Sequence, residues 1–407
     1  MSPPELIGLE EARAAVLDRA RALPAGCLAL GAALGRVLAE DLASVEPVPG
    51  FDNSAMDGFA VRSRDTKGAS PGAPAALEII DESRAGMPAR CGVGAGEAIR
   101  ISTGAMLPAG ADSVLRVEDA GLYGERVLVA GEIEAGRDIR RCGEDIGVGE
   151  KVLAAGTPIG PAELGVIASL GLESVPCHRC PRVHVLASGD ELLEPGEEMR
   201  PGGVRNSNGY TLSALAERAG AEVCGTGRVP DELEGTRAAI APALGADVVV
   251  ISGGVSVGEH DHVKEALTEL GAQRVFWGIA LKPGRPTWFG THGKTLVFGL
   301  PGNPVSAAVT FLLLVRPALA ALAGAGPARR RTVAKLTRDY KKQPGRTHAI
   351  RCRLELCEDG WHADPTGAQG SHILSSMLGA ECLALIPAEA TALGAGERVE
   401  VEFIDRG

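Results

Sequence analysis

Apolar residues recur at helical spacing near the start of the chain, in the segment 9–23, with charged residues between them. This pattern predicts an amphipathic helix with one buried face. The apolar positions are Ala12, Val16, Ala20 and Leu23. A second short helix is expected over 30–42, and a third over 160–170, which would pair with the N-terminal helices. These segments predict a discontinuous helical unit made of residues 1–44 and 150–180.

The pattern changes between residues 45 and 149, where Gly and Pro recur every few residues and separate short apolar runs. Such runs, bounded by turn-forming residues, predict strands. The expected strands are 75–80, 98–101, 113–117 and 126–129. This segment is therefore predicted to be a β-rich domain inserted between the two parts of the helical unit.

Strand and helix patterns alternate over residues 181–326. Such alternation implies right-handed crossovers and a parallel sheet covered on both faces. The expected strands are 183–186, 222–226, 247–251 and 295–300, and the expected helices are 210–219, 232–244, 262–270 and 305–322. After a linker near 324–331, a small β domain is predicted over 327–407, with strands at 349–356, 382–386 and 398–403.

The composition narrows the possible functions. The 407-residue chain is 45% hydrophobic and has a formal net charge of -11, so a packed protein is expected and nucleic acid is not its expected partner. The N-terminus has no basic-then-apolar signal pattern, and the longest apolar run, 305–315, is too short to span a bilayer. A soluble, cytoplasmic protein without membrane contact is therefore expected.

The nine cysteines are scattered along the chain, which favours reduced thiols over a disulfide framework. Cys177 and Cys180 form a Cys-x-x-Cys, but no second pair follows at zinc-finger spacing. They are interpreted as two thiols in a linker.

Three predicted loops leave strands and enter helices, and ligands of open α/β sheets bind outside the carboxyl ends of the strands. The loop at 251–261 is rich in glycine, so its backbone can approach a phosphate closely. Glu259 and Asp261 are placed to hold a metal ion beside that phosphate. The alternative is an ordinary tight turn with Asp261 as a helix N-cap.

The other two loops admit the same two interpretations. Pro304 suits the first turn of a helix, with Asn303 as its N-cap residue. The N–H groups of this helix start would bind an anion, or Asn303 would simply cap the helix. In the loop at 187–192, Asp190 and Glu191 are adjacent carboxylates that can supply a metal ligand or a base, or can be solvated.

Cations lie between these loops along the chain. Lys282 and Arg285 bracket a Pro-Gly turn, so both can face one pocket and bind an oxyanion. A surface turn with two solvated cations is the alternative. His260 and His262 flank Asp261 and would be metal ligands or exposed side chains.

One competing motif points to another chemistry. Residues 254–258 satisfy Gly-x-Ser-x-Gly, the nucleophile elbow of α/β-hydrolases, with Ser256 as the nucleophile. A hydrolase also needs a downstream histidine on the same sheet. The candidates are expected elsewhere, with His292 in a hairpin and the others in the β domain: His348, His362 and His372.

Seven motifs, taken together and in this order, resemble the MoeA family, the bacterial counterpart of the gephyrin E domain. They are FDNSAMDGFAVR at 51–62, STGA at 102–105, SGDEL at 188–192, GGVSVG at 253–258, KPGRP at 282–286, PGNP at 301–304 and GSH at 370–372. The resemblance implies an elongated β-rich domain, a helical linker unit, a MogA-like three-layer α/β domain and a C-terminal β-barrel. It also implies a homodimer with a cleft between the α/β domain of one subunit and the β-rich domain of the other.

The resemblance further implies a transferase of molybdenum cofactor biosynthesis, which inserts molybdate into adenylylated molybdopterin and releases AMP with the help of Mg²⁺. The implied catalytic residues are Asp57 and Thr103, from the partner subunit, and Glu191, Asp231, Asp261 and Lys282. Nucleotide and phosphate would contact Gly253, Gly254, Ser256, Gly258, Pro301, Gly302, Asn303 and Pro304. Molybdate would contact Ser256, Lys282, Arg285, Ser306, Arg351 and Ser371. Mg²⁺ would be held by Glu191 and Asp261.

The chain departs from the family pattern at a few positions. Gly278 stands where some members carry a second basic residue, and Arg285 replaces a common lysine, which keeps the charge but changes its geometry. Arg346 and Arg353 are close enough in the sequence to take the role of Arg351.

Other functions stay open at this point. Tungstate is a tetrahedral dianion of similar size to molybdate, so a tungstate enzyme is one alternative. A scaffold without catalysis is another, although the intact acidic set of the implied site argues against it. A MogA-like adenylyltransferase is expected as the upstream partner.

Overall fold

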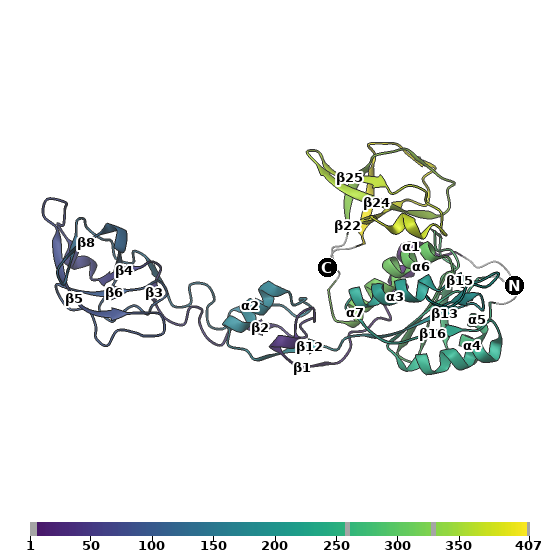
Figure 1. The fold of residues 1–407 in the computed structure, drawn as a ribbon, viewed down its shortest axis with the longest axis horizontal. Coiled ribbons are helices and arrows are strands. Elements are labelled where there is room, and N and C mark those ends of the chain that lie inside the picture. The colour runs from purple at the N-terminus through teal and green to yellow at the C-terminus, as the bar shows by residue number, and fades with distance from the viewer. Residues whose placement is uncertain (1–5, 257–260, 327–330, 405–407) are drawn as a thin grey trace.

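The computed structural model describes residues 6–256, 261–326 and 331–404 and shows an elongated molecule (Figure 1). A β-rich lobe lies at one end and is connected by a narrow middle unit to a larger α/β body, which carries a C-terminal β lobe. The chain runs from the body through the middle unit to the β-rich lobe and then returns. The middle unit is therefore built from two separate stretches of sequence.

The body is built on a six-stranded sheet in the order β16-β13-β17-β21-β20-β18. The first four strands are parallel, as predicted, and their bounds are Glu222–Val229, Arg182–Ser188, Val248–Ser252 and Thr295–Leu300. β20 (Trp288–His292) and β18 (Gln273–Trp277) are antiparallel, so the expectation of an all-parallel sheet is wrong at this edge. The reason is the two-residue turn between His292 and Thr295, because strands joined so tightly can only pair antiparallel.

Helices cover both faces of this sheet, as predicted. On one face lie α1 (Leu9–Leu17), α3 (Ser207–Arg218), α6 (Pro304–Thr310) and α7 (Arg316–Leu322), and on the other lie α4 (Leu233–Ile240) and α5 (Val263–Glu269). Alternate residues of β17 pack into the cores on the two faces of the sheet. Val248 and Val250 pack on the face of α1, α3, α6 and α7, and Val249 and Ile251 pack on the face of α4 and α5. The predicted three-layer α/β arrangement is confirmed.

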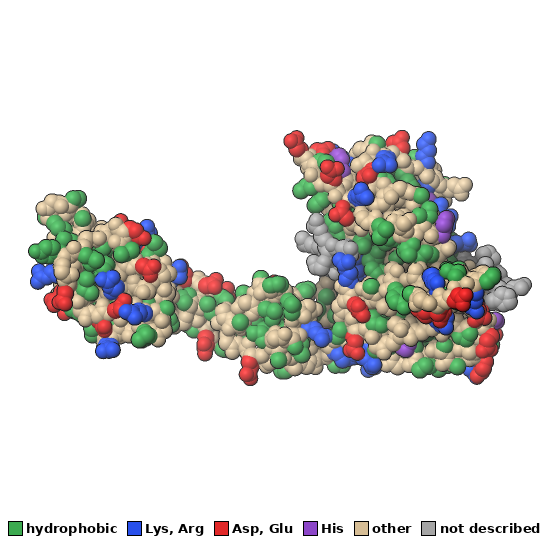
Figure 2. Space-filling view, in the orientation of Figure 1, with side chains coloured by type: hydrophobic (Ala, Val, Ile, Leu, Met, Phe, Trp, Pro, Cys, Tyr) green, Lys and Arg blue, Asp and Glu red, His purple; other side chains and the backbone are tan. Residues whose placement is uncertain are grey.

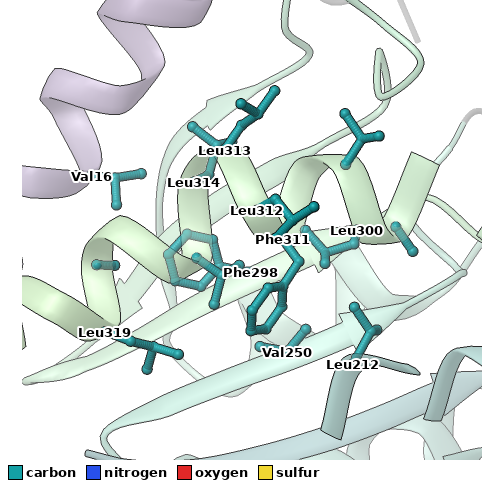
Figure 3. Close-up of a cluster of buried hydrophobic side chains, with 14 of the residues drawn as sticks. Val16, Leu212, Val250, Phe298, Leu300, Phe311, Leu312, Leu313, Leu314 and Leu319 are labelled. Carbon is teal, nitrogen blue, oxygen red and sulfur yellow. The ribbon is translucent and has the colours of Figure 1, made fainter. Parts of the chain in front are cut away.

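The helical stretch Pro304–Leu322 is the core helix of the body (Figure 3). It consists of α6, one π-helical turn over Phe311–Val315, and α7. Phe311 lies toward Phe298 of the sheet, and α1 covers another side of the helix with Val16. The stretch is long and apolar enough to cross a membrane, but 83% of its apolar window is buried inside the fold.

The N-terminal helix belongs to this body and not to the middle unit. α1 buries Leu9, Ala12 and Val16 against α7 and the π-helical turn. The predicted pairing with the helix at 160–170 is therefore wrong. The physical reason is that the core helix is apolar on nearly all sides and offers the apolar face of α1 a surface to bury.

The middle unit is held together by strands rather than by paired helices. β1 (Ala25–Ala29) pairs with β12 (Ser174–His178), and β2 (Leu42–Ala43) pairs with β11 (Lys151–Leu153). α2 (Pro161–Ser169) confirms the helix predicted over 160–170.

The helix predicted over 30–42 is wrong. The segment contains one 3-10 turn, Leu30–Ala32, followed by isolated bridges from Val37 and Leu38. Gly35 has a φ of 75°, which is outside the helical range, and glycine costs a helix about 1 kcal/mol relative to alanine. The two glycines of this segment therefore outweigh its apolar pattern.

The β-rich lobe contains a six-stranded sheet in the order β7-β4-β6-β5-β9-β8. The bounds are Ser113–Arg116, Gly58–Val61, Glu97–Ile101, Ala75–Ser83, Arg126–Val129 and Ala120–Tyr123, so the four predicted strands are confirmed. β3 (Asn53–Ser54) and β10 (Ile139–Arg140) form a separate pair. A Cβ on Gly58 would lie 1.9 Å from the Leu115 carbonyl oxygen, which explains why β4 starts with glycine.

The C-terminal lobe is a closed five-stranded barrel, as predicted. Its strands are β22 (Arg331–Leu336), β24 (Thr347–Cys357), β25 (Gly360–Pro365), β26 (Cys382–Ile386) and β28 (Arg398–Phe403). β24 pairs with β25 and β26, and β22 and β28 close the ring. A further short pair in this lobe joins β23 (Tyr340–Lys341) to β27 (Ala392–Leu393). In the body, a short parallel pair joins β14 (Leu192–Leu193) to β15 (Val204–Arg205).

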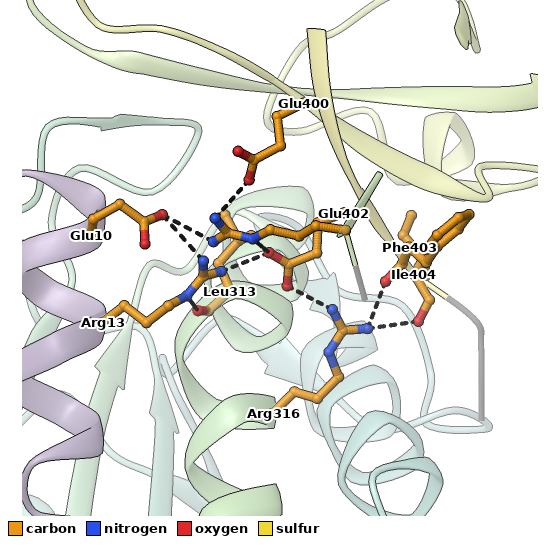
Figure 4. Close-up of polar contacts among 9 residues, drawn as sticks. Glu10, Arg13, Leu313, Arg316, Glu400, Glu402, Phe403 and Ile404 are labelled. Atoms are coloured by element: carbon orange, nitrogen blue, oxygen red, sulfur yellow. Dashed lines mark hydrogen bonds and ion pairs between the residues drawn. The ribbon is translucent and has the colours of Figure 1, made fainter. Parts of the chain in front are cut away.

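Two features join the barrel to the body. β19 (Leu281–Lys282) leaves the body and pairs with β24, so that Lys282 lies opposite His348. A group of buried charges crosses the same junction (Figure 4). Glu402 of β28 is 4% exposed and accepts hydrogen bonds from Arg13 of α1 at 2.7 Å and from Arg316 of α7 at 2.8 Å. The barrel is thus fixed to the α/β body.

Candidate active site

The loops that follow the parallel strands meet at one edge of the sheet, as predicted. β13, β17 and β21 are neighbours, so the loops after them are adjacent, and the loop after β16 lies beside them. The Gly253 N–H donates to the Leu300 carbonyl oxygen at 2.9 Å. A Cβ on Gly302 would lie 3.7 Å from the Gly253 Cα. The two glycine loops are therefore in direct contact.

The loop after β17 depends on its glycines. Gly253 and Gly254 have φ values of 93° and 68°, which L side chains rarely adopt. A Cβ on Gly254 would lie 2.3 Å from Cγ2 of Val263, so no side chain fits there. Ser256 at the end of this loop is exposed. The predicted residues Gly258, Glu259 and His260 lie outside the described residues.

The loop after β21 leads directly into the core helix. Asn303 is the N-cap residue of α6 and Pro304 its first residue, as predicted, and the Asn303 side chain makes no capping hydrogen bond. Asn208 of α3 donates to the Gly302 carbonyl oxygen at 2.8 Å and to the Ser252 hydroxyl at 2.7 Å. No sequence pattern pointed to Asn208, because it lies on a different helix, away from these loops in the chain.

The acidic residues gather at the same edge. The Asp190 N–H donates to the Asp231 carboxylate at 3.0 Å, and the Asp231 N–H donates to the Asp190 carboxylate at 3.3 Å. A Cβ on Gly189 would lie 2.3 Å from Oε2 of Glu191, so the Glu191 carboxylate is folded over that glycine. Asp190, Glu191 and Asp231 thus come from two loops that support each other.

Asp261 lies two residues before Val263, the first residue of α5. The residue directly before this helix is His262, which has helical backbone angles and makes no side-chain capping hydrogen bond, so the alternative in which Asp261 caps the helix stays a prediction. Within the described part of the chain, no three His, Cys, Asp or Glu side chains are grouped closely enough to form a metal site by themselves.

A cavity of about 570 Å³ lies where the body meets the barrel. Three cations line it: Lys282, Arg285 and Arg346. Hydroxyl and other polar groups complete the lining, namely Ser306, Tyr340, Gln369, Ser371 and His372. Among the described residues that line the cavity none is acidic, although the chain as a whole carries a net charge of -11. The cavity is therefore suited to an anion.

The structure places Arg351 behind this cavity rather than in its lining. Its guanidinium is fully buried and donates to the carbonyl oxygens of Ala368 at 3.3 Å and Gly370 at 3.2 Å, and to the Ser376 hydroxyl at 2.9 Å. Burial lowers the pKa of Arg351 to about 10. The implied contact of Arg351 with molybdate stays a prediction: in this structure Arg351 holds the loop that carries Ser371, and Arg346 supplies the third cation of the cavity lining.

The helix and the loop of this cavity are also linked. The Val305 N–H, in the first turn of α6, donates to the Ser371 carbonyl oxygen at 3.1 Å. Ser306, buried in the same turn, thereby faces the cavity beside Ser371. Four residues implied for molybdate are brought together here: Lys282, Arg285, Ser306 and Ser371.

A neutral histidine lies under the cations. His348 is 4% exposed, and its Nδ1 lies 3.1 Å from the Tyr340 hydroxyl. Burial lowers the pKa of His348 to about 4, and the charges of Lys282, Lys342 and Arg346 add to this effect. At neutral pH the imidazole therefore adds no charge.

Asp57 and Thr103 are brought together in the β-rich lobe but not with the other residues. The Thr103 N–H donates to the Asp57 carboxylate at 2.8 Å, and both side chains are exposed. Their lobe and the α/β body lie at opposite ends of the molecule (Figure 1). Within one chain, these two residues cannot reach the cavity.

The structure does not support the hydrolase alternative. His292 lies at the end of the β20–β21 hairpin where β21 begins, whereas Ser256 follows the opposite, carboxyl end of the parallel strands. His348 and His362 are on barrel strands, and His372 is on a barrel loop, as predicted. All nine cysteines are free thiols, including Cys177 and Cys180.

Three family models match nearly the whole chain. The MoeA N-terminal region, domains I and II, matches residues 7–171. A probable molybdopterin binding domain matches residues 184–321, and the MoeA C-terminal region, domain IV, matches residues 333–404.

Curated and solved relatives agree with these models along the full length of the chain. The chain is 38% identical to a molybdopterin molybdenumtransferase of Haemophilus influenzae, over 98% of both proteins. It is 35% identical to that of Bacillus subtilis, over 93% of this chain and 89% of the relative. A solved MoeA protein from Pyrococcus horikoshii is 33% identical, with a TM-score of 0.84, over 99% of this chain and 100% of that one. The chain therefore belongs to the molybdopterin molybdenumtransferase (MoeA) family and is a transferase of molybdenum cofactor biosynthesis.

Proposed function

We propose that this chain inserts molybdate into adenylylated molybdopterin and releases AMP in a Mg²⁺-dependent reaction. The observation that carries the proposal is the acid-free cavity with Lys282, Arg285 and Arg346 in an otherwise acidic protein. A tetrahedral dianion is held well by several fixed cations and hydroxyl donors. Ser306 and Ser371 supply such hydroxyls at the same place.

The nucleotide and its phosphates are proposed to lie on the two glycine loops. Backbone N–H groups at a glycine turn and at a helix N-terminus favour phosphate. The loop 253–256 and the loop 301–304 provide both and are in contact through Gly253 and Leu300. In this proposal the sheet edge holds the phosphates from which AMP leaves, and the cavity holds the oxyanion near the sulfur atoms of the pterin.

The acidic residues fit a Mg²⁺ ion that arrives with phosphate. Mg²⁺ usually takes only one or two protein carboxylates and completes its shell with water and substrate phosphate. Glu191 and Asp261 would be these ligands, with Asp190 and Asp231 ordering the loop that carries Glu191. When bound, the ion would supply positive charge next to the phosphoanhydride that is cleaved.

A homodimer is proposed because the site of one chain is incomplete. Asp57 and Thr103 lie too far from the body of their own chain and would contribute to the site of a second copy. Figure 2 shows hydrophobic side chains on the surface of the β-rich lobe and the middle unit. Exposed examples are Leu34, Val45, Leu122, Tyr123 and Val148. Burial of such side chains between subunits would stabilise the dimer.

The cellular context is proposed on the same basis. A cytoplasmic location suits a small-molecule reaction with free thiols and a buried core helix. A MogA-like adenylyltransferase is the expected upstream partner, since the substrate must be adenylylated first.

The test is AMP release from adenylylated molybdopterin in the presence of Mg²⁺. Wild type and Asp261→Ala are compared with and without molybdate, and with tungstate in a parallel series. We expect molybdate-dependent release from wild type and its loss in the variant. A folded, dimeric wild type that releases no AMP with either oxyanion would contradict the proposal and favour a non-catalytic scaffold.

A further inference from the structure

The glycine loop after β17 is held from behind by two side chains that the proposed function does not use. The indole N–H of Trp277, at the end of β18, donates to the Val255 carbonyl oxygen at 2.9 Å. The ammonium of Lys264, in the first turn of α5, donates to the Ser256 carbonyl oxygen. Two consecutive carbonyl groups are thus fixed by side chains from two different elements.

Lys264 and Trp277 also contact each other. Nζ of Lys264 lies 3.9 Å from the centre of the Trp277 ring, in the geometry of a cation–π interaction. Trp277 is buried in the core between α4, α5 and the sheet, so its ring is a rigid platform for the ammonium. The charge of Lys264 also interacts with that of Asp261. The position of Lys264 is therefore well determined.

The direction of the peptide unit between Val255 and Ser256 follows from these bonds. A trans peptide directs its C=O and its N–H to opposite sides. Because the Val255 carbonyl points at Trp277, the Ser256 N–H points away from Trp277, out of the core. Ser256 is exposed, so this outer side faces solvent, where the phosphate of the proposed function would bind.

We propose that Lys264 is a positioning residue for the phosphate-binding loop, acting together with Trp277. The pair fixes the peptide unit so that the Ser256 N–H faces the ligand. This inference rests on the proposed function to the extent that the ligand of the loop is the phosphate of a nucleotide.

The probe is AMP, with binding measured by isothermal titration calorimetry. We expect Lys264→Met to weaken AMP about tenfold, the equivalent of one charge-assisted hydrogen bond. Lys264→Arg keeps the charge and the donors and should restore most of the affinity. Lys294→Met is the matched control, since Lys294 is exposed in the hairpin turn at the opposite edge of the sheet.

A second variant tests the pair. Trp277→Phe keeps a ring but loses the N–H, and it should also weaken AMP. The double variant Lys264→Met with Trp277→Phe should bind AMP only slightly more weakly than the single variant that has the lower AMP affinity. The reason is that the two side chains act on one peptide unit. Molybdate affinity, which depends on the cavity at the barrel, should change less than about twofold in each variant.

Tryptophan fluorescence gives a readout that activity does not. AMP should change the emission of wild type, and Trp277→Phe should lose this change, while Trp361 in the barrel remains as a reference. Equal AMP affinity in wild type and Lys264→Met would overturn the inference and leave the proposed function intact. A parallel loss of AMP affinity, molybdate affinity and thermal stability would also overturn it, since it would indicate a general structural role. Wild type that binds no AMP would instead count against the proposed nucleotide site.

Discussion

The loop after β17 makes a strict demand on a single residue, Gly254. Gly254 combines a left-handed backbone with a Cβ direction that points into Val263. Gly165 in α2 is the opposite case, because its φ is ordinary and a Cβ there would meet open space. The two glycines therefore allow the same substitution to be compared in two environments.

Gly254→Ala should destabilise the protein by about 2–3 kcal/mol, because strain and a steric clash add. Gly165→Ala should stabilise it by about 0.5–1 kcal/mol, because alanine is the better residue inside a helix. Urea unfolding measures both. A loss of stability in Gly165→Ala equal to that in Gly254→Ala would contradict the steric explanation.

The two arginines near the cavity should respond differently to substitution. Arg346→Gln removes a cation from the lining and should weaken molybdate about tenfold with little change in stability. Arg351→Met leaves buried acceptors without a donor and should lower the free energy of unfolding by about 3 kcal/mol. Calorimetry with molybdate and urea unfolding separate these effects. If Arg351→Met weakened molybdate binding without any loss of stability, Arg351 would be a ligand after all.

His348 should make stability depend on pH. Its pKa in the fold, about 4, lies below the ordinary value of 6.5, so the unfolded chain binds more protons between these values. The contribution is complete above pH 6.5 and is lost as the pH falls toward 4, by about 3 kcal/mol in total. When the free energy of unfolding is plotted against pH, its slope between pH 4 and 6.5 should be smaller in His348→Asn than in wild type. Equal slopes in this window would contradict the assignment to His348.

At the scale of elements, the core helix shows how one proline is accommodated. Pro317 has no N–H, so the Leu313 carbonyl oxygen lacks the donor that a regular helix would supply four residues later. The π-helical turn Phe311–Val315 lies at this point, and Arg13 of α1 donates to Leu313 O at 3.1 Å. α1 thus supplies a hydrogen-bond donor to the core helix and also covers its apolar surface.

Arg13→Met should therefore cost about 2–4 kcal/mol, because it leaves the Leu313 carbonyl and the buried Glu402 carboxylate with one donor fewer. Arg19→Met is the control, since Arg19 is on the surface of the same segment and should change stability by less than about 0.5 kcal/mol. Thermal unfolding of the two variants decides the point. Similar melting temperatures for both would mean that the π-helical turn does not need Arg13.

Elements with strong local signals could be predicted from the sequence, and elements defined by distant partners could not. β17 is a run of β-branched residues, and the core helix is a long apolar stretch, so both were evident. The hairpin predicted at His292 is confirmed as β20–β21, but β18 and the bounds of β20 could not be predicted, because their pattern is broken and they form only at the edge of an existing sheet. The apolar spacing of residues 30–42 is helical, but Gly31 and Gly35 prevent a helix from forming there.

The same distinction holds for the site. Loops at strand ends could be placed together from the order of strands and helices alone. The positions of Arg346 and Arg351 could not, because they depend on how β24, which begins directly after Arg346, faces the loop 368–371, and that register comes from pairing with β25 and β26. Asn208 and Lys264 lie on helices, and only the packing of those helices brings them to the loops.

At the scale of the whole molecule, the proposed dimer can be tested by mixing inactive variants. Asp57→Ala damages the lobe side of a shared site, and Asp261→Ala damages the body side. In a mixed dimer one of the two sites combines an intact lobe with an intact body. Equal mixing with free subunit exchange should therefore restore about one quarter of wild-type activity, since half of the dimers are mixed. AMP release by each variant alone and by the mixture is the measurement, and an inactive mixture of exchanging subunits would place both residues in one chain's own site.

The strand β19 has a consequence for exchanging parts between relatives. β19 begins the turn of the body that carries Lys282 and Arg285. Its pairing partner, however, is β24, the barrel strand that follows Arg346. A chimera joined in the linker near residue 326 would therefore combine a turn from one parent with a barrel from another. We expect such recombinants to fold but to bind oxyanions poorly, unless residues 281–286 are transplanted with the barrel.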